Sequence, residues 1–320
     1  MPDYTPVVND NLTEAFSALD LIPDAYKGSD RFLDIVSWNL RYFHDQDYNR
    51  VERIVNIMDA LNADVFVLQE ILDGSLQAVA DGLSDAGAGY YQVAYGQTGG
   101  NQRVAVMYDL DWVRAKDDIH EIFNDKDYLS PDGKKAFPRR PLWGFFTCLT
   151  YDPQEAPFDF QLLGLHLKSQ RGGGGAQRQK SAELLRDWLT EKAVLTDADV
   201  IMAGDWNEPP DSSTWDPIKE LETQGEVAFA GVNDASDFSH LMYRNKKNLG
   251  SRLDLAAISV AALAEMRDAP ATVRWTTLDK LLEANPKAKQ LKAYIKEVRD
   301  KISDHMPVVT RFYFTERDSS

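Results

Sequence analysis

A carboxylate and an amide follow directly on an apolar run in the middle of the chain, in the sequence VIMAGDWNEPP (200–210). The four apolar residues predict a strand that is buried on both faces, and Gly204 interrupts the run just before Asp205. Because residues i and i+2 of an extended chain point to the same side, Asp205 and Asn207 project together from the strand end. Ligand sites of open α/β sheets lie at such ends, but Gly, Asp and Asn are also common turn residues, so both interpretations stay open.

Other strand-like runs of the chain also end in polar residues. Glu70 follows the apolar residues 65–68 after a single glutamine, and a carboxylate in that position is costly unless it is hydrated, paired or metal-bound. The polar residues at strand ends are Asn39, Glu70, His166, Asp205, Asn207, Asp254, Asp304 and His305. Each alone is more often structural than catalytic, but their recurrence along one chain indicates a shared site.

The order of elements places two of these residues at the same edge of a sheet. Residues 48–61 have apolar side chains at helical spacing and lie between strands predicted at 33–38 and 65–68. A strand, a helix and a strand in this order imply a right-handed crossover and neighbouring parallel strands. The ends of both strands, with Asn39 and Glu70, are therefore expected at one edge.

The same periodicity predicts the remaining elements. Helices are predicted at 12–21, 75–84, 177–194 and 215–222. Strands are predicted at 90–95, 103–108, 112–123, 142–150, 158–166, 200–203, 253–260 and 306–314. An irregular stretch is expected between the last of these helices and Gly250.

The chain is predicted to form a single domain over residues 32–315, because no long linker rich in Gly, Ser or Pro interrupts it. Residues 1–31 are predicted as an N-terminal extension and residues 316–320 as a C-terminal tail. Residues 261–302 are predicted as a helical excursion in which Pro286 separates two halves. This excursion holds the most basic run of the chain: Lys287, Lys289, Lys292, Lys296, Arg299 and Lys301. Such a run is usually a solvated helix face, and a patch that faces the substrate is the alternative.

The composition limits the classes of function. A chain of 320 residues that is 43% hydrophobic can bury a large core. Its formal net charge of −16 repels nucleic acid phosphates and anionic membranes at long range, so a phosphodiester substrate needs a local basic patch or divalent cations. Cys148 is the only cysteine, which excludes an internal disulfide and a thiolate metal site.

No apolar run approaches the roughly 18 residues of a membrane helix, so we expect no membrane span. Residues 1–11 lack the basic, apolar and small-residue order of a signal peptide. The expected location is therefore cytoplasmic if Met1 is the native start, and secreted if a leader has been removed.

The polar motifs, taken in their order along the chain, resemble those of the deoxyribonuclease I-like endonuclease/exonuclease/phosphatase superfamily. They are SWNLR (37–41), LQE (68–70), GLHLKS (164–169), GDWNEPP (204–210), SRLDLAAIS (251–259) and SDHMPV (303–308). The single pairs QE and DH are weak signals, but the ordered set is specific and extends over residues 33–314. The resemblance implies an α/β fold, a four-layer α/β/β/α sandwich in which two mixed β-sheets pack face to face with helices outside.

The resemblance also implies a divalent metal site at one end of the sandwich. It makes Glu70 the main metal ligand, with Asn39 and Asp304 beside it, directly or through water. Ligands that offer only oxygen suit Mg²⁺, with Mn²⁺ or Ca²⁺ as substitutes. Whether one or two metals bind stays open.

The resemblance implies catalytic roles for a second group of residues. Asp254 would hold His305, since a carboxylate fixes the tautomer of an imidazole and raises its basicity. Asp205 would orient or deprotonate the attacking water, and Asn207 would hold a phosphate oxygen. These residue types suit phosphorus chemistry, because in-line attack loads negative charge on the phosphoryl and leaving oxygens, which a metal and a histidinium can stabilise.

Two arginines match positions that contact substrate phosphate in the family, Arg41 and Arg139, and a guanidinium fork suits that task. The register of the second is uncertain by one place, because Arg140 adjoins it.

His166 matches a second catalytic histidine of the nuclease branch, but the chain departs from the family pattern at its partner. The tyrosine and glutamate that the branch carries before the corresponding RVAV-like strand fall on Gly100 and Gln102. No carboxylate partner for His166 is therefore identified.

The spacing around His166, followed by Arg178 and a long helix, resembles bacterial deoxyribonuclease-like members of the superfamily. The tract that follows Asn207 differs from that of abasic-site endonucleases. We therefore expect a metal-dependent nuclease that cleaves DNA with little sequence preference, acting as a monomer with no obligate protein partner. No zinc finger or recognition helix is evident, which fits readout of the DNA backbone.

Two other functions stay open. One is a phosphatase or phosphodiesterase for small or lipid phosphates, such as a relative of inositol phosphatases or sphingomyelinases, which the acidic surface favours. The other is a non-catalytic binding module that kept the fold. Loss of a metal ligand or base would support the module, yet Glu70, Asp205, Asn207 and His305 are all present.

Overall fold

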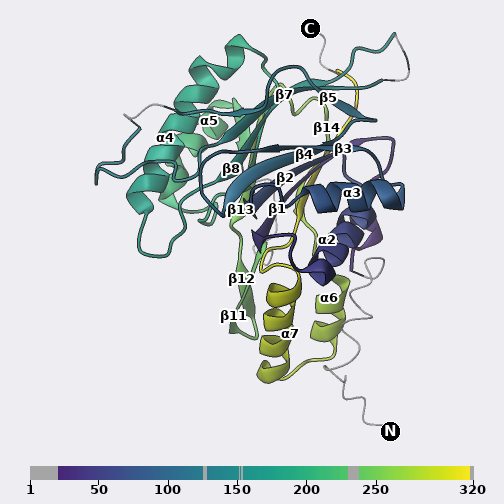
Figure 1. The fold of residues 1–320 in the computed structure, drawn as a ribbon. Coiled ribbons are helices and arrows are strands. Elements are labelled where there is room, and N and C mark those ends of the chain that lie inside the picture. Colours follow the sequence, from purple (N-terminus) through teal and green to yellow (C-terminus); the bar gives the residue numbers. More distant parts are fainter. Residues whose placement is uncertain (1–20, 125–127, 151, 153, 230–237, 318–320) are drawn as a thin grey trace.

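The structure is a computed structural model that describes residues 21–124, 128–150, 152, 154–229 and 238–317. Two β-sheets pack face to face, and helices cover their outer faces (Figure 1). This arrangement confirms the predicted α/β/β/α sandwich. The helix predicted at 12–21 lies outside the described residues except for Leu21. Within the described ranges, no helix is both long enough and apolar enough to cross a membrane.

The first sheet contains the amino-terminal strands. Its strands are, in spatial order, β14 (Met266–Thr272), β15 (Val308–Phe312), β1 (Leu33–Phe43), β2 (Val65–Ile71), β4 (Arg103–Asp109) and β3 (Tyr91–Tyr95). The strands β1 and β2 run parallel and are joined by the helix α2 (Tyr48–Leu61). The predicted crossover is therefore confirmed, and it brings Asn39 and Glu70 to one edge.

The second sheet contains the strand that carries Asp205. Its strands are, in spatial order, β10 (Val227–Phe229), β13 (Asp254–Ser259), β9 (Val200–Asp205), β8 (Asp159–His166), β7 (Leu142–Cys148) and β5 (Val113–Ala115), and β6 (His120–Glu121) also pairs with β7. Instead of the single strand predicted at 112–123, this segment forms the two short strands β5 and β6.

The helix α2 shows how local signals set the boundaries of an element. The carboxylate of Asp47 accepts a hydrogen bond from the main-chain nitrogen of Arg50 at 3.2 Å, which satisfies a free donor of the first turn. The helix ends at Asn62, which adopts the left-handed conformation with φ of 44°. The side chains it buries against the sheet are Arg50, Val51, Ile54, Ile57, Met58 and Leu61.

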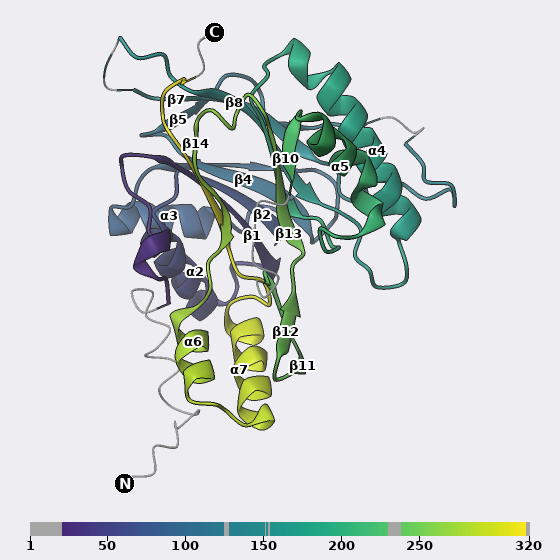
Figure 2. The same ribbon diagram turned by 180° about the vertical axis from the view of Figure 1, so that it is seen from behind.

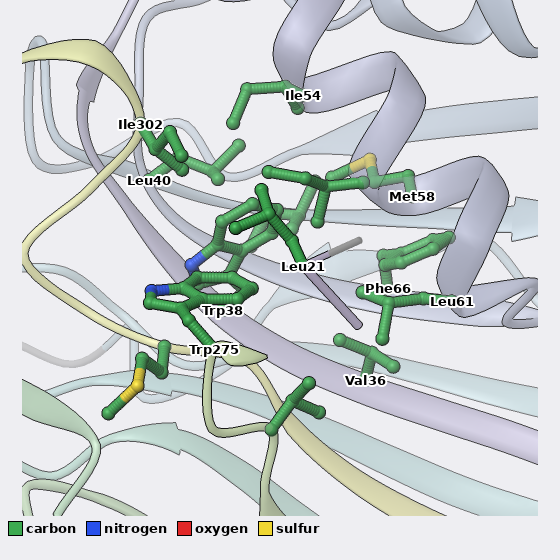
Figure 3. Packing of buried hydrophobic residues seen from close by; sticks show 14 of the residues in the cluster. Leu21, Val36, Trp38, Leu40, Ile54, Met58, Leu61, Phe66, Trp275 and Ile302 are labelled. Atoms are coloured by element: carbon green, nitrogen blue, oxygen red, sulfur yellow. The ribbon is translucent and has the colours of Figure 1, made fainter. Parts of the chain in front are cut away.

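Three apolar clusters hold the layers together. The first lies under α2 and α3 (Gln77–Ala86), where Trp38 of β1 meets Trp275 edge to face at 6.1 Å (Figure 3). The second lies under α4 (Gly175–Glu191) and α5 (Asp216–Gln224). The third lies between the sheets and contains Ile35 and Ile201, one from each. The strands are thus fixed from both faces, so their polar ends have defined positions.

An extension projects from one end of the sandwich. It contains α6 (Thr276–Glu283), α7 (Ala288–Lys301) and the hairpin of β11 (His240–Asn245) and β12 (Asn248–Ser251), and α7 lies beside the hairpin in both views (Figures 1 and 2). Residues 261–302 also include β14, an edge strand of the first sheet that the periodicity does not predict. The strands β10, β11 and β12 form where an irregular stretch is expected.

Candidate active site

The register of the second sheet brings three functional side chains together. Asp205 pairs with His166 on the parallel strand β8 and with Asp254 on the antiparallel strand β13. Gly204 allows this close approach, because a Cβ atom at this position would lie 2.0 Å from the carbonyl oxygen of Leu165. The glycine before Asp205 is therefore required by packing.

Asn39 connects the two sheets at the site. Its Nδ2 donates a hydrogen bond to Oδ2 of Asp205 at 3.0 Å, and its Oδ1 accepts one from the main-chain nitrogen of Arg41 at 2.9 Å. The hydroxyl of Ser303 donates to the carbonyl oxygen of Asn39 at 2.6 Å and accepts from the main-chain nitrogen of His305 at 3.0 Å. The side-chain amide of Asn39 thus fixes Asp205, and its main-chain carbonyl oxygen fixes the turn that carries His305.

Several site residues hold unusual backbone conformations. Arg41, Tyr42, Glu70 and Asn207 have φ values of 45°, 49°, 60° and 61°. This left-handed region costs a non-glycine residue of order 1–3 kcal/mol and persists only where the surroundings enforce it. At Tyr42 the main-chain nitrogen donates to Oε2 of Glu70 at 3.1 Å, and at Asn207 it donates to Oδ1 of Asp205 at 2.9 Å. The carboxylates therefore take part in enforcing the turns that surround them.

His305 forms an ion pair with buried carboxylates. Its Nδ1 lies 2.7 Å from Oδ2 of Asp254, and its Nε2 lies 3.9 Å from Oδ2 of Asp205. Burial lowers the pKa of His305, but the charge and hydrogen bond of Asp254, with Asp205 and Asp304, outweigh it and raise this pKa to about 10. Burial raises the pKa of Asp205 to about 7, although the charge of His305 opposes the shift. A charged imidazole thus faces a carboxyl group that can gain or lose a proton near neutrality.

The surroundings of His166 lower its pKa, whereas those of His305 raise it. Its Nε2 lies 3.7 Å from Oδ2 of Asp205 and 3.9 Å from Oε1 of Glu70. Burial, followed by the charges of Arg139 and His305, lowers its pKa well below the usual value, and the main chain of Gln102 opposes this only in part. No side-chain carboxylate bonds to the buried Nδ1 among the described residues, in agreement with the departure at Gln102. The two histidines therefore differ in charge at neutral pH.

The two predicted phosphate-binding arginines have different environments. Nε of Arg41 lies 3.3 Å from Oδ2 of Asp304, and about a third of the Arg41 side chain is exposed. The guanidinium of Arg139 is buried and donates to the main-chain oxygens of His166 and Leu167. Arg139 borders the site, whereas Arg140 bonds to Asn124 and does not line the cleft, so the geometry favours Arg139 as the predicted position.

These side chains border a cleft with a volume of about 490 Å³. All of the predicted site residues line it except Asn39 and Asp254, which act on lining residues through their hydrogen bonds. Further lining residues that the sequence motifs do not identify are Tyr42, Arg171, His240, Met242 and Arg244. The ring of His240 lies 4.7 Å from that of His305, and the only sequence signal for it is that the chain has just five histidines.

Comparison with known proteins agrees with this geometry. A family model described as the Endonuclease/Exonuclease/phosphatase family matches residues 36–219. The chain belongs to this family. Members of the Endonuclease/Exonuclease/phosphatase family are divalent-metal-dependent phosphoester hydrolases, so the predicted reaction class is confirmed at that level. A search of the curated proteins found no match.

Solved structures of the Endonuclease/Exonuclease/phosphatase family share the fold. A family protein from Bacteroides thetaiotaomicron has a TM-score of 0.58 and 17% identity, and the match covers 88% of this chain and 98% of that one. A mannosyl-6-phosphatase from the same organism has a TM-score of 0.58 and 17% identity, and the match covers 87% of this chain and 98% of that one. TDP2 from C. elegans has a TM-score of 0.53 and 17% identity, and the match covers 89% of this chain and 77% of that one. At these identities the likeness concerns the fold alone.

The residues present fit the divalent metal that the Endonuclease/Exonuclease/phosphatase family requires. Oδ1 of Asn39 and Oε2 of Glu70 accept hydrogen bonds from the consecutive main-chain nitrogens of Arg41 and Tyr42, and Asp304 pairs with Arg41. Three oxygen-bearing side chains thus surround one turn, and a hard cation prefers such donors. Ligating atoms also lie within 4.8 Å of one another in two groups, His240 with Asp304 and His305, and Asp205 with Asp254 and His305.

Proposed function

We propose that this protein is a nuclease that hydrolyses phosphodiester bonds of DNA with little sequence preference. The observation that carries the proposal is that Arg41, Arg139, Arg171 and Arg244, from four separate segments, line one cleft. A phosphodiester polymer places phosphates on both sides of the scissile group, so it can engage cations from several directions, whereas a monoester offers one phosphate. Cations gathered at the cleft of a chain with net charge −16 form the local basic patch that such a substrate needs.

The proposed metal residues are Asn39, Glu70 and Asp304. A bound Mg²⁺ or Mn²⁺ would supply Lewis-acid stabilisation of charge on the phosphate. The turn at Arg41 and Tyr42 positions the oxygens of Asn39 and Glu70 through its main-chain donors.

Asp205 is the proposed base for the attacking water. Burial raises the pKa of Asp205 to about 7, which suits a group that must accept a proton near neutral pH. The bond from Asn39 and the bond to the main chain of Asn207 hold the carboxylate in place. Its side chain is buried yet borders the cleft, so water can reach it there only from the substrate side.

His305 is the proposed group that stabilises negative charge as the phosphoryl group is attacked. Asp254 holds its Nδ1 and keeps the ring charged, so Nε2 can donate toward the cleft. Asn207 and the neutral His166 are proposed to contact phosphate oxygens beside it, and Arg41 and Arg139 to supply positive charge.

A phosphatase for small phosphorylated molecules is the second candidate. The cleft of about 490 Å³ has the size of a pocket for one small molecule. A structural neighbour is named a mannosyl-6-phosphatase, with 17% identity over most of both chains. The size of the cleft is the observation that favours a monoester substrate.

Two assays on the same protein separate the candidates. With Mg²⁺ present, the nuclease proposal expects rapid nicking of supercoiled plasmid that stops on addition of EDTA. The second candidate expects release of inorganic phosphate from inositol phosphates or mannose 6-phosphate, with the plasmid left intact. A His305→Ala variant purified in the same way controls for contaminating nucleases, and nicking that persists in this variant would contradict the nuclease proposal.

A further inference from the structure

A second groove lies beside the cleft, between β11 and α7. It has a volume of about 370 Å³ and is lined by His240, Leu241, Met242, Tyr243, Lys292, Ile295, Lys296, Arg299 and Asp304. His240, Met242 and Asp304 also line the cleft, so the groove lies directly beside it. The hairpin and α7 project beyond the body of the sandwich (Figure 2). A ligand held in the cleft can therefore continue outward along this groove.

The segments on either side of the groove are basic, although the chain as a whole is acidic. Residues 240–252 contain four cations and no acidic residue, namely Arg244, Lys246, Lys247 and Arg252. Residues 287–301 contain six cations against Glu297 and Asp300. Because the formal net charge of the chain is −16, this concentration of positive charge makes the groove complementary to an anionic ligand.

The cations of the groove are available to a ligand. Lys296 and Arg299 both pair with Asp300, at 3.2 and 3.0 Å, but these pairs are exposed and worth little. Lys292 lies over the ring of Tyr243, with Nζ 5.0 Å from the ring centre. It forms no ion pair with a carboxylate in the part of the chain that the structure describes. Phosphate oxygens would thus replace weak partners or water.

The groove also offers apolar surface for bases. Met242 is 40% exposed, and Tyr243 is partly buried beside it. Proteins that bind single strands combine cations that follow the phosphates with apolar or aromatic side chains that contact the bases. A hollow of about 370 Å³ has the size of a pocket for one small molecule, so it can hold a nucleotide of a single strand.

We propose that the groove between β11 and α7 binds a single nucleic acid strand that continues from the scissile phosphate. Lys292, Lys296 and Arg299 contact its phosphates, and Met242 contacts a base. The proposal rests on the nuclease function proposed above and adds the path that one strand of the substrate takes beyond the scissile phosphate. The basic run of α7 then faces the substrate instead of being only a solvated helix face.

The test measures binding without cleavage. A fluorescently labelled single-stranded 20-nucleotide DNA is titrated with the full-length protein in EDTA, and affinity is read by anisotropy at several salt concentrations. The variant is Lys292→Glu with Lys296→Glu. The matched control, Lys192→Glu with Lys219→Glu, makes the same change in charge on the outer side of the second sheet, where Lys219 also has an acidic partner, Asp216. Thermal melting confirms that both variants are folded.

We expect the groove variant to bind at least about tenfold more weakly than wild type, and the control to bind as wild type does. For the groove variant, the slope of log affinity against log salt concentration should be shallower by roughly 1–1.5, since each lost phosphate contact removes about 0.7 from the slope. Equal affinities of the groove variant and the control would overturn the proposal. An equal loss of affinity for the duplex of the same sequence would overturn the single-strand assignment.

Plasmid nicking by wild type separates this proposal from the nuclease function. If wild type nicks plasmid while the groove variant binds the oligonucleotide normally, the groove assignment fails and the nuclease function stands. If wild type neither binds the oligonucleotide nor nicks plasmid, both fail.

Discussion

Buried carboxylates lie at both ends of the strands, and one of the two groups contains Asp205, which borders the cleft. Asp34 and Asp64 lie at the start of β1 and just before β2, whereas Asp205 and Asp254 lie where Asn39 of β1 reaches across. Asn39 is five residues after Asp34 along the extended strand, which is a distance of about 17 Å. The two groups therefore belong to opposite ends of the sandwich: the far end, where Asp34 and Asp64 lie, and the site end, where Asp205 and Asp254 lie.

At the far end the carboxylates accept hydrogen bonds from main-chain nitrogens. Oδ2 of Asp64 accepts a hydrogen bond from the main-chain nitrogen of Asp34 at 2.7 Å, and Asp109 accepts one from that of Tyr90 at 3.1 Å. Oδ1 of Asp34 pairs with Nε of Arg311 at 2.7 Å. Main-chain donors and one arginine are the partners of these groups, and the arrangement joins the strand ends.

At the site the partners are side chains that can exchange protons. Asp254 pairs with His305, and Asp205 lies within 4 Å of both His166 and His305. Burial raises the pKa of Asp205, but it also raises those of Asp34, Asp64 and Asp109. A raised pKa therefore does not identify a site in this molecule. The features that identify the site are histidine partners and access to a cleft.

The largest expected effect comes from removing the histidine at the site end. His305→Ala should lower kcat by about 10³-fold, because it deletes the charge that faces the attacked phosphate. Asp34→Asn removes a carboxylate of the far end and should leave kcat within about twofold. Turnover is measured with the substrate identified by the plasmid and phosphate-release assays. A folded His305→Ala protein with normal turnover would contradict the role of the site end.

The next effect separates two carboxylates within the site end. Glu70→Ala should weaken metal binding at least about tenfold, as even loss of an outer partner of a metal ligand does. Excess Mg²⁺ or Mn²⁺ should therefore restore part of its activity. Asp205→Asn should bind metal nearly as wild type does but turn over slowly. Calorimetric titration with Mn²⁺ measures the affinities directly, and a large loss in Asp205→Asn would place Asp205 in a metal site.

The fold followed from the sequence where apolar runs are long and buried. The strand, helix and strand over residues 33–71 form as predicted, because both strands are covered on both faces and so have no polar alternation to confuse the pattern. Glycine and proline mark the end of β9 in the sequence, and Asp205 lies at that end in the structure.

The elements that sequence patterns did not identify lie at sheet edges or outside the sheets. The strand β14 has Pro270 in its interior, and proline is tolerated there because β14 is the edge of the first sheet. The hairpin of β11 and β12 pairs with neither large sheet, so no buried face imposes an alternating pattern. Tertiary contacts determine such elements more than local sequence does.

The residues of the site also divide into those that sequence motifs predicted and those that only tertiary contacts bring to the cleft. The ordered motifs predicted that Asn39, Asp205 and His305 converge, and the structure brings them together through hydrogen bonds and close contacts. His240 reaches the cleft from β11, a strand without a sequence signal, so nothing local marked it. The bond from Arg41 to the main chain of Arg299 likewise joins residues 258 positions apart, which no local pattern predicts.

The smallest expected effect concerns the far end alone and is visible in the pH dependence of stability. Burial raises the pKa of Asp34 to about 6 from 3.8, although Arg311 opposes the shift. Between these values the folded protein binds more protons than the unfolded chain, so the stability that protonation supplies is complete below pH 3.8 and is lost as pH rises through about 6. The free energy of unfolding should therefore fall by up to about 1.4 kcal/mol per pH unit from this group.

Asp34→Asn should remove this part of the slope, measured by urea unfolding in EDTA between about pH 4 and pH 7. Adding Mg²⁺ changes the stability of both proteins through the site end, because a ligand that binds only the folded state stabilises it. The difference between wild type and Asp34→Asn should nevertheless stay the same, since Asp34 lies about 17 Å from Asn39. A difference that changes with Mg²⁺ would show that the two carboxylate groups are coupled, and the far end would then belong to the working site.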